Sequence, residues 1–197
     1  MTRAGEPEDG QLETRDSHRE LASPPEVWVV PAIARPDEPF VAGERAMLDG
    51  FLDRHRASLL YRCAGLTAEQ LTLRAVPPSN LSLLGLIRHV TDVERTWFRQ
   101  RFLGTSLPSL YARPDKPDAA FEELDPRQAP AAIDALKREW ELCRAELKGA
   151  SLDDTFLSER WGEMSLRWVY LHLIGEYAQH IGHADLLRER IDGTTGW

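Results

Sequence analysis

The residues with the clearest chemical potential lie together near the C-terminal end of the chain. His172, Glu176 and His180 follow one another at intervals of four residues, and His183 comes three residues later. On a helix with 3.6 residues per turn, Glu176 and His180 fall one turn apart within the apolar stripe of this segment, with His172 and His183 on its flank. Imidazole nitrogens and carboxylate oxygens are ligands of divalent metals, so the spacing indicates a metal site.

Glu176 needs a partner, because burying an ionised carboxylate alone is strongly unfavourable. A second helical segment offers one. His89 lies at the edge of an apolar stripe that includes Leu86 and Val93. His89 and the Glu176–His180 pair form a set of three ligands that leaves coordination positions open for water or substrate. Open positions are typical of catalytic rather than structural metal sites.

Two interpretations without a metal stay open at this point. His89 could instead be a core histidine that is satisfied by a hydrogen bond, and Glu176 could instead form an ion pair with an arginine of a neighbouring helix. His172 and His183 are expected to support the ligands or to lie at the surface, rather than to bind the metal themselves.

Four amphipathic segments are expected to position these residues. Apolar side chains recur every three or four residues in segments 43–65, 82–104, 129–149 and 165–192. Residues 104–126 contain four prolines and form a connection that is long for antiparallel neighbours. The sequence therefore predicts an all-α fold, a four-helix bundle with a long crossover between helices 2 and 3 and no convincing strand.

The composition limits the classes of partner and the compartment. The net charge is −8 and no run of basic residues is present, so we do not expect nucleic acid as a partner. No apolar stretch is long enough for a signal peptide or a membrane span, and two cysteines are too few for a disulfide framework. We therefore expect a cytoplasmic protein without a membrane partner. Residues 1–42 are predicted to be a tail, mostly disordered and then extended, and residues 43–197 to form the domain.

Two segments resemble the motif blocks of a known superfamily. PPSNLSLLGLIRHVTDVERTWF (77–98) and SLRWVYLHLIGEYAQHIGHADLLRERIDGTTG (165–196) are similar to the DinB-like metalloenzymes, and in particular to their DUF664 branch, which includes the mini-circle proteins. The resemblance implies an up-down-down-up bundle and a divalent metal, zinc or nickel. It maps the ligands to His89, Glu176 and His180, in the Glu-x-x-x-His form of the mycothiol-dependent maleylpyruvate isomerases. Gly175 and Ile181 depart from the DUF664 pattern, where Glu and Asn are expected.

The resemblance also implies a reaction class. Several relatives use low-molecular-weight thiols, and a metal with an open position favours the thiolate form of a bound thiol. We therefore expect a metal-dependent thiol S-transferase or related isomerase acting on a small molecule, with mycothiol favoured over bacillithiol by the arginine-rich composition. His183 is the candidate general base, and Asp92 and His172 are expected to orient the ligands.

Two other functions remain as alternatives, a non-catalytic metal- or ligand-binding bundle associated with stress or a mobile element, and a metal-assisted hydrolase. Bundles of this superfamily often dimerise, so a homodimer is also an expectation.

Overall fold

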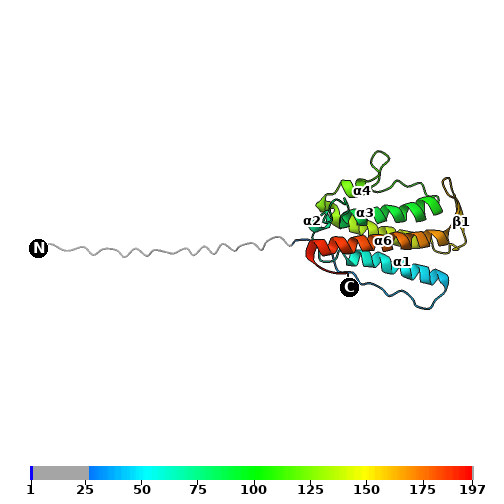
Figure 1. Cartoon of the computed structure of the whole chain (residues 1–197), viewed down its shortest axis with the longest axis horizontal. Coiled ribbons are helices and arrows are strands. Elements are labelled where there is room, and N and C mark those ends of the chain that lie inside the picture. The colour runs from blue at the N-terminus through cyan, green and yellow to red at the C-terminus, as the bar shows by residue number, and fades with distance from the viewer. Residues whose placement is uncertain (2–26, 197) are drawn as a thin grey trace.

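The computed structural model describes Met1 and residues 27–196, which form a mostly helical fold (Figure 1). The longer helices of this part of the chain are α1 (Glu44–Tyr61), α3 (Leu83–Glu94), α5 (Ala129–Glu146) and α6 (Leu166–Asp192). The shorter elements are α2 (Ala68–Leu71), the π-helix η1 (Arg95–Phe102), α4 (Ala119–Glu122), the 3-10 helix η2 (Pro126–Gln128), and strands β1 (Thr155–Ser158) and β2 (Gly162–Ser165). The predominantly helical character expected from the sequence is confirmed. Of the tail expected over residues 1–42, residues 2–26 lie outside the described residues.

The expectation of an all-α fold misses a small β-hairpin. β1 and β2 pair antiparallel, from Thr155 opposite Ser165 to Ser158 opposite Gly162. Gly162 has a φ of +78°, a left-handed conformation that glycine adopts without steric cost. Each strand has only four residues, which is too short for a clear alternation of apolar and polar positions. The residues between the segments expected at 129–149 and 165–192 therefore give no clear strand signal in the sequence.

The second expected helix, residues 82–104, changes its hydrogen-bond pattern part of the way along. It is α-helical to Glu94 and continues as the π-helix η1. A π-helix has wider turns than an α-helix, so the side chains after Glu94 point in directions that an uninterrupted α-helix would not give them. Trp97 and Phe98 are buried in this stretch, and Trp97 contacts Trp168 at the start of α6.

Side-chain caps fix the beginnings of the two helices that carry the candidate ligands. The Ser82 hydroxyl accepts a hydrogen bond of 3.1 Å from the backbone N–H of Gly85, at the start of α3. The Ser165 hydroxyl accepts one of 3.2 Å from the backbone N–H of Trp168, at the start of α6. Each cap satisfies an amide that has no partner within its own helix, and so defines where the helix begins.

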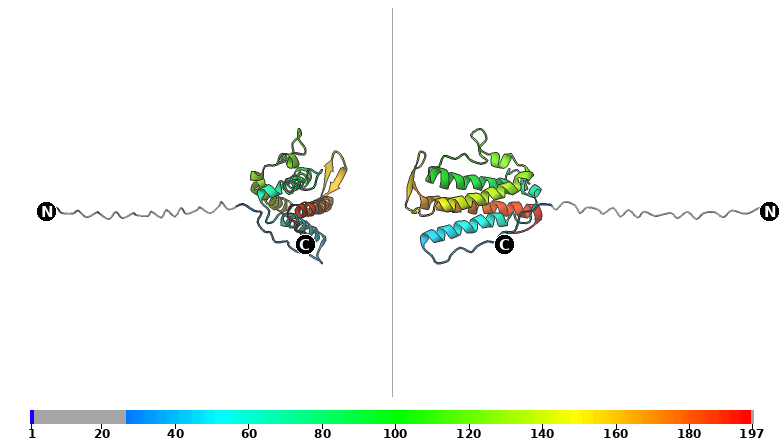
Figure 2. Two further views of the ribbon diagram at one scale, coloured as in Figure 1. Left: turned by 60° about the vertical axis from the view of Figure 1, so that its left-hand side comes forward. Right: turned by 180° about the vertical axis from the view of Figure 1, so that it is seen from behind.

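The long helices pack side by side around a single apolar core. Figure 1 shows α3, α6 and α1 running along one another, and the view from behind in Figure 2 shows α5 on the opposite face. α1 packs mainly on α6, and α3 packs on both α5 and α6. The contact between α3 and α6 brings the two helices of the candidate site together. Within the described residues, no helix is both long and apolar enough to cross a membrane.

Buried charges lie at the centre of this core. The Glu94 carboxylate, which is fully buried, accepts hydrogen bonds from Arg56 Nε at 2.8 Å and from the Tyr177 hydroxyl at 2.7 Å. The Tyr177 hydroxyl in turn accepts a hydrogen bond of 3.0 Å from Trp140 Nε1. These contacts join α1, α3, α5 and α6, so the network fixes how the four helices are set against one another.

Candidate functional site

Three of the residues singled out in the sequence come together between α3 and α6. His89 projects from α3, and Glu176 and His180 project from α6. One ligand atom from each lies within 4.8 Å of the others. Glu176 Oε2 is 3.8 Å from His89 Nε2 and 3.5 Å from His180 Nε2. The side chains of His89 and Glu176 are 32% and 26% exposed, so the cluster is open to solvent on one side.

Two of the three separations within this cluster are close to those of ligands that share a cation, and the third is within 4.8 Å. Zinc ligands lie about 2.0–2.2 Å from the ion, so two oxygen or nitrogen ligands of a tetrahedral site are roughly 3.3–3.6 Å apart. The two distances from Glu176 Oε2, 3.5 Å and 3.8 Å, are close to that range and longer than a typical hydrogen bond. Two imidazoles and one carboxylate are also a donor set that zinc and nickel accept. The residues present therefore fit the metal that the superfamily resemblance implies.

The surroundings favour the neutral, ligand form of the imidazoles. Burial lowers the pKa of His89, although the charge of Glu176 opposes this effect. Burial, together with the nearby His89, lowers the pKa of His180 to about 4. Both rings are therefore neutral at pH 7, and a neutral imidazole can offer a nitrogen lone pair to a cation without first losing a proton.

His183 contacts the far side of one candidate ligand. Its Nδ1 lies 3.3 Å from His180 Nδ1, so one ring donates a hydrogen bond and the other accepts it. When His180 Nε2 serves as a ligand, its Nδ1 carries the proton and His183 Nδ1 is the acceptor. A hydrogen bond of this kind fixes the tautomer and the orientation of a ligating histidine.

His172 lies on the other side of Glu176, between the cluster and a group of indole rings. Its Nε2 is 3.8 Å from Glu176 Oε1. The His172 ring stacks on Trp168, with centroids 4.8 Å apart and planes 11° apart, and meets the Trp97 ring edge-on at 4.6 Å. Burial lowers the pKa of this histidine as well. His172 therefore joins the cluster of His89, Glu176 and His180 to an aromatic surface.

Asp92 contacts the crossover segment rather than the cluster. Its carboxylate accepts hydrogen bonds from the backbone N–H groups of Leu110, Tyr111 and Ala112 at 2.6–3.0 Å. Its negative charge raises the pKa of His89 through space and so opposes the effect of burial. Asp92 thus anchors the crossover segment beside His89, and the orienting role expected for it remains a prediction.

The crossover segment and α4 cover the outer side of His89. The Phe121 ring of α4 packs against the His89 ring at a centroid distance of 5.4 Å. Next to them is a cavity of about 280 Å³ whose lining includes His89, Asp92, Thr96, Ser109, Asp118 and Phe121. This cavity gives a small molecule access to the imidazole from the crossover side.

The sequence did not reveal how the tryptophans are arranged. Trp97 is buried, whereas Trp161 and Trp168 are 48% and 41% exposed. Trp161 lies in the hairpin, and its ring stacks on Trp97 at 5.7 Å. Because the hairpin was not expected, nothing in the local pattern placed Trp161 near α6. The one available signal was the unusual number of tryptophans, six in the chain.

Comparison with known proteins places the chain in a family. A helical fold with a His89, Glu176 and His180 cluster is the arrangement expected of a DinB-like protein. The family model described as mycothiol-S-transferase matches residues 47–193. The chain therefore belongs to the mycothiol-S-transferase family, a member of the DinB-like superfamily. None of the curated proteins searched matches the chain. The finer placement in the DUF664 branch is not confirmed.

Proposed function

We propose that the protein is a metal-dependent S-transferase that joins mycothiol to a small electrophile. The observation that carries this proposal is the convergence of His89, Glu176 and His180 within 4.8 Å, in a chain of the mycothiol-S-transferase family. The open side of the cluster favours a catalytic site over a purely structural one, because structural metal sites are closed by protein ligands. For the same reason we favour a transferase over the alternative of a non-catalytic metal-binding bundle.

Each residue of the site has one role in this proposal. We propose that His89, Glu176 and His180 hold one divalent cation, zinc or alternatively nickel. When bound, such a cation supplies a position for the thiol sulfur and lowers the thiol pKa, so that the thiolate form prevails at neutral pH. His183 then orients His180 through their hydrogen bond of 3.3 Å, and we give it this positioning role in place of the general base expected from the sequence.

The overall reaction balances without an oxidant or a reductant. The thiol S–H bond breaks and its proton passes to solvent. The sulfur forms a new bond to an electrophilic carbon, and the leaving group departs from that carbon with its bonding electron pair. An isomerase related to this reaction would instead add the thiol and release it again. A hydrolase would use water in place of the thiol, so it would not need mycothiol.

We extend the proposal to the domain architecture, the partners and the compartment. Residues 43–197 form one DinB-like domain, a four-helix bundle in up-down-down-up order, of which the family matches 47–193. We propose that the partners are small molecules and that the compartment is the cytoplasm. A homodimer is compatible with this proposal but is not needed for it.

Proton release on thiol binding tests the proposal independently of the unknown electrophile. Mycothiol is titrated by calorimetry into zinc- or nickel-loaded protein at pH 7, in two buffers with different ionisation enthalpies. We expect binding with the release of about one proton per thiol, because a bound thiolate has lost its proton. His180→Ala should abolish the release. His55→Ala is the matched control, since His55 lies on α1 and bonds to Phe51 O, away from the cluster. Binding without proton release, or none at all, would contradict the proposal.

A further inference from the structure

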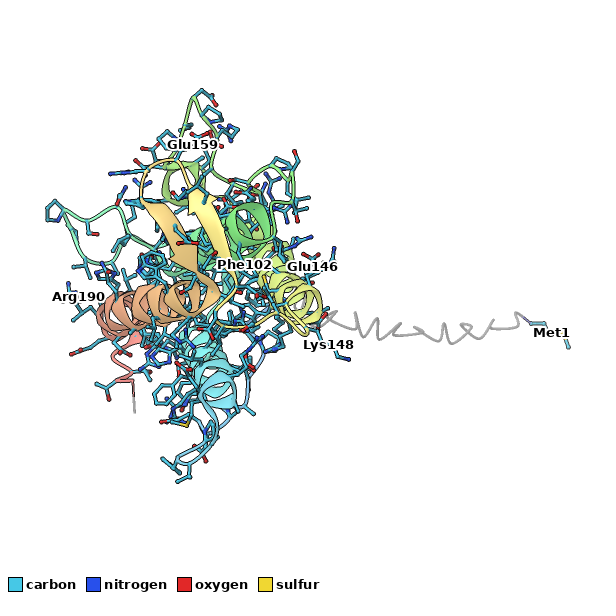
Figure 3. The ribbon with its side chains drawn as sticks, turned by 90° about the vertical axis from the view of Figure 1, so that its right-hand side faces the viewer. Met1, Phe102, Glu146, Lys148, Glu159 and Arg190 are labelled. Carbon is cyan, nitrogen blue, oxygen red and sulfur yellow. The ribbon has the colours of Figure 1, made fainter. Side chains whose placement is uncertain are left out.

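One side of α6 is exposed over most of the helix and carries no charged side chain from Trp168 to Leu186. In Figure 1, α6 crosses the near side of the molecule between α3 and α1, and in Figure 3 it lies on the opposite side from α5, on which Glu146 is labelled. The exposed residues recur every three or four positions, so they form one continuous strip. We call this strip the outer face of α6: Trp168, Leu171, Gly175, Ala178, Gln179, Gly182 and Leu186.

Two glycines in the outer face are not required by the fold of the described residues. A Cβ added at Gly175 or Gly182 would meet no heavy atom within 4 Å, and neither glycine has a positive φ. Glycine is less favourable than alanine inside a helix, so both positions carry a cost that no contact within the described residues explains. Without side chains, however, they let another backbone approach the helix closely. The two glycines therefore point to a neighbour that packs closely against this face.

The outer face is symmetric about its midpoint, which lies between Ala178 and Gln179. Pairs of identical residues lie at equal distances on either side of this midpoint: Gly175 with Gly182, and Leu171 with Leu186. The two leucines are also equally exposed, at 57%. In a dimer with a two-fold axis, residue i of one copy meets residue j of the other, and j meets i. In an antiparallel pair of α6 helices that cross at the midpoint, leucine therefore meets leucine and glycine meets glycine.

The ends of the outer face also complement each other in this arrangement. Trp168 is 41% exposed at the start of α6. It lies as far from the midpoint as Glu189, so the C-terminal end of the second α6 passes over it. Arg190 follows Glu189 and is exposed. A guanidinium over an exposed indole is a favourable contact, so Arg190 of the partner subunit can stack on Trp168.

Charge and area both suit a second copy of the chain as the neighbour. The chain has a net charge of −8, so two copies repel each other least where they meet on an uncharged surface. The outer face is about 27 Å long, and α1 and α3 lie on either side of it at axis separations of about 8–10 Å, so the whole face measures roughly 700 Å². A standard interface buries about 800 Å² of each partner. The face is therefore large enough for a specific dimer.

We propose that two copies of the chain form a homodimer by packing the outer faces of α6 antiparallel, with the two-fold axis between Ala178 and Gln179. The dimer needs neither a metal nor a thiol, so it does not rest on the proposed function. His172, Glu176 and His183 border the outer face on one side of the helix. The two-fold axis lies in the interface and keeps this side common to both copies, so the two candidate metal centres lie along the same edge of the dimer.

Sedimentation velocity of the full-length protein tests whether the dimer exists. We expect the mass to rise from 22.4 kDa toward twice that value as the protein concentration is raised to about 0.3 mM. Leu171→Lys should weaken association about 100-fold, because it places an unpaired charge at both ends of the interface. Leu157→Lys is the matched control, since Leu157 is also exposed but lies on β1. A Leu171→Lys variant that associates as well as the wild type would overturn the proposal. A wild type that stays monomeric would also overturn it and leave the outer face to another occupant.

A second substitution in the same chain tests the antiparallel arrangement. Adding Leu186→Glu to Leu171→Lys places opposite charges face to face at both ends of the dimer, so association should recover at least about tenfold. Adding Leu186→Lys to Leu171→Lys should give no recovery, because like charges then meet. The two positions are about 22 Å apart on one helix, so they do not pair within a single chain. Equal association of the two double variants would overturn the antiparallel dimer.

A cysteine next to the proposed two-fold axis tests its position. Ala178→Cys brings each new thiol close to the same thiol of the other copy, so mild oxidation should give a covalent dimer on a non-reducing gel. Ala131→Cys is the matched control, because Ala131 is exposed on α5, which lies on the opposite face (Figure 2). Cys63 and Cys143 are buried and do not compete. Equal cross-linking of the two variants, or none in Ala178→Cys, would overturn the proposal.

Gly175→Ala distinguishes the dimer from the helix itself. In concentrated protein it should weaken association about tenfold, because a new methyl group stands between the two helices at two symmetric points. In dilute protein, where single chains prevail, the same substitution favours the helix. A Gly175→Ala variant that associates as tightly as the wild type would overturn the close approach of the two helices.

The outcome is distinguishable from a failure of the proposed function. Circular dichroism confirms that each variant keeps its helical content, and association is measured without added mycothiol. A monomeric wild type with normal proton release on mycothiol binding rejects the dimer alone. A dimer that responds to the Leu171 and Leu186 substitutions as expected, but does not respond to mycothiol, rejects the transferase and supports the dimer.

Discussion

Replacing Glu94 by glutamine should destabilise the protein strongly, because Glu94 compensates a charge at the centre of the core. The Arg56 side chain is 4% exposed and pairs with Glu94 at 2.5 Å and 2.8 Å. Burial acts to lower the pKa of Arg56, but the charge of Glu94 and their hydrogen bonds outweigh it and raise that pKa above its ordinary value. Because arginine is always protonated in proteins, the guanidinium stays charged in Glu94→Gln, loses its buried partner and keeps only the half-buried Asp53.

The expected loss is a large part of the total stability. Removing one partner of a buried ion pair costs about 3–5 kcal/mol, out of roughly 5–15 kcal/mol for a whole domain. We expect about 3 kcal/mol for Glu94→Gln, since the amide keeps one acceptor for Arg56 or Tyr177. For a domain of this size that corresponds to a fall in Tm of roughly 6–12 °C.

Urea unfolding followed by circular dichroism measures this loss. Arg56→Gln and the double variant complete a double-mutant cycle. The double variant should lose about 2 kcal/mol less unfolding free energy than the two single variants lose together. Glu123→Gln is the control, because Glu123 forms an exposed ion pair with Arg113 and should leave the unfolding curve nearly unchanged. A loss under about 1 kcal/mol in Glu94→Gln, or strict additivity in the cycle, would refute the reasoning.

Further predictions concern two glycines, a cysteine and a histidine. Gly85→Ala should lower the free energy of unfolding by about 1–3 kcal/mol, because the new Cβ would lie 2.5 Å from the Phe121 ring. Gly175→Ala should raise the free energy of unfolding by up to about 1 kcal/mol, because the new Cβ would meet no heavy atom within 4 Å and alanine favours a helix more than glycine does. Equal effects of the two variants in urea unfolding would refute this. Burial raises the pKa of Cys63 to about 12, so its thiol stays protonated from pH 7 to 9 and should react with iodoacetamide only after denaturation, as mass spectrometry would show. His183→Phe should weaken zinc binding about 10- to 100-fold, measured by competition with a chelator, and unchanged affinity would remove its positioning role.

Much of the candidate site followed from periodicity alone. The four-residue interval between Glu176 and His180 needs only a regular helix to bring them onto one face, and α6 is regular from Leu166 to Asp192. The position of His89 followed from the apolar stripe of its own helix, together with the need of Glu176 for a partner. The convergence of the three was thus predictable, whereas the metal itself remains a proposal.

Features that depend on non-local contacts were not predictable in the same way. The π-helix η1 changes the direction of Trp97 without any proline or glycine to signal the change. Trp161 reaches Trp97 only because a hairpin of two four-residue strands folds over η1 and α6. The pairing of Arg56 with Glu94 joins residues 38 positions apart, and nothing near either residue indicates it. These contacts are decided by packing between elements, so local patterns do not contain them.

Metal content tests the central claim, that His89, Glu176 and His180 hold one divalent ion. The wild type, His180→Ala and His55→Ala are loaded with zinc or nickel, dialysed, and analysed for metal by mass spectrometry against protein concentration. We expect about one ion per chain in the wild type and in His55→Ala, and little in His180→Ala. Equal metal in all three proteins, or none in the loaded wild type, would contradict it.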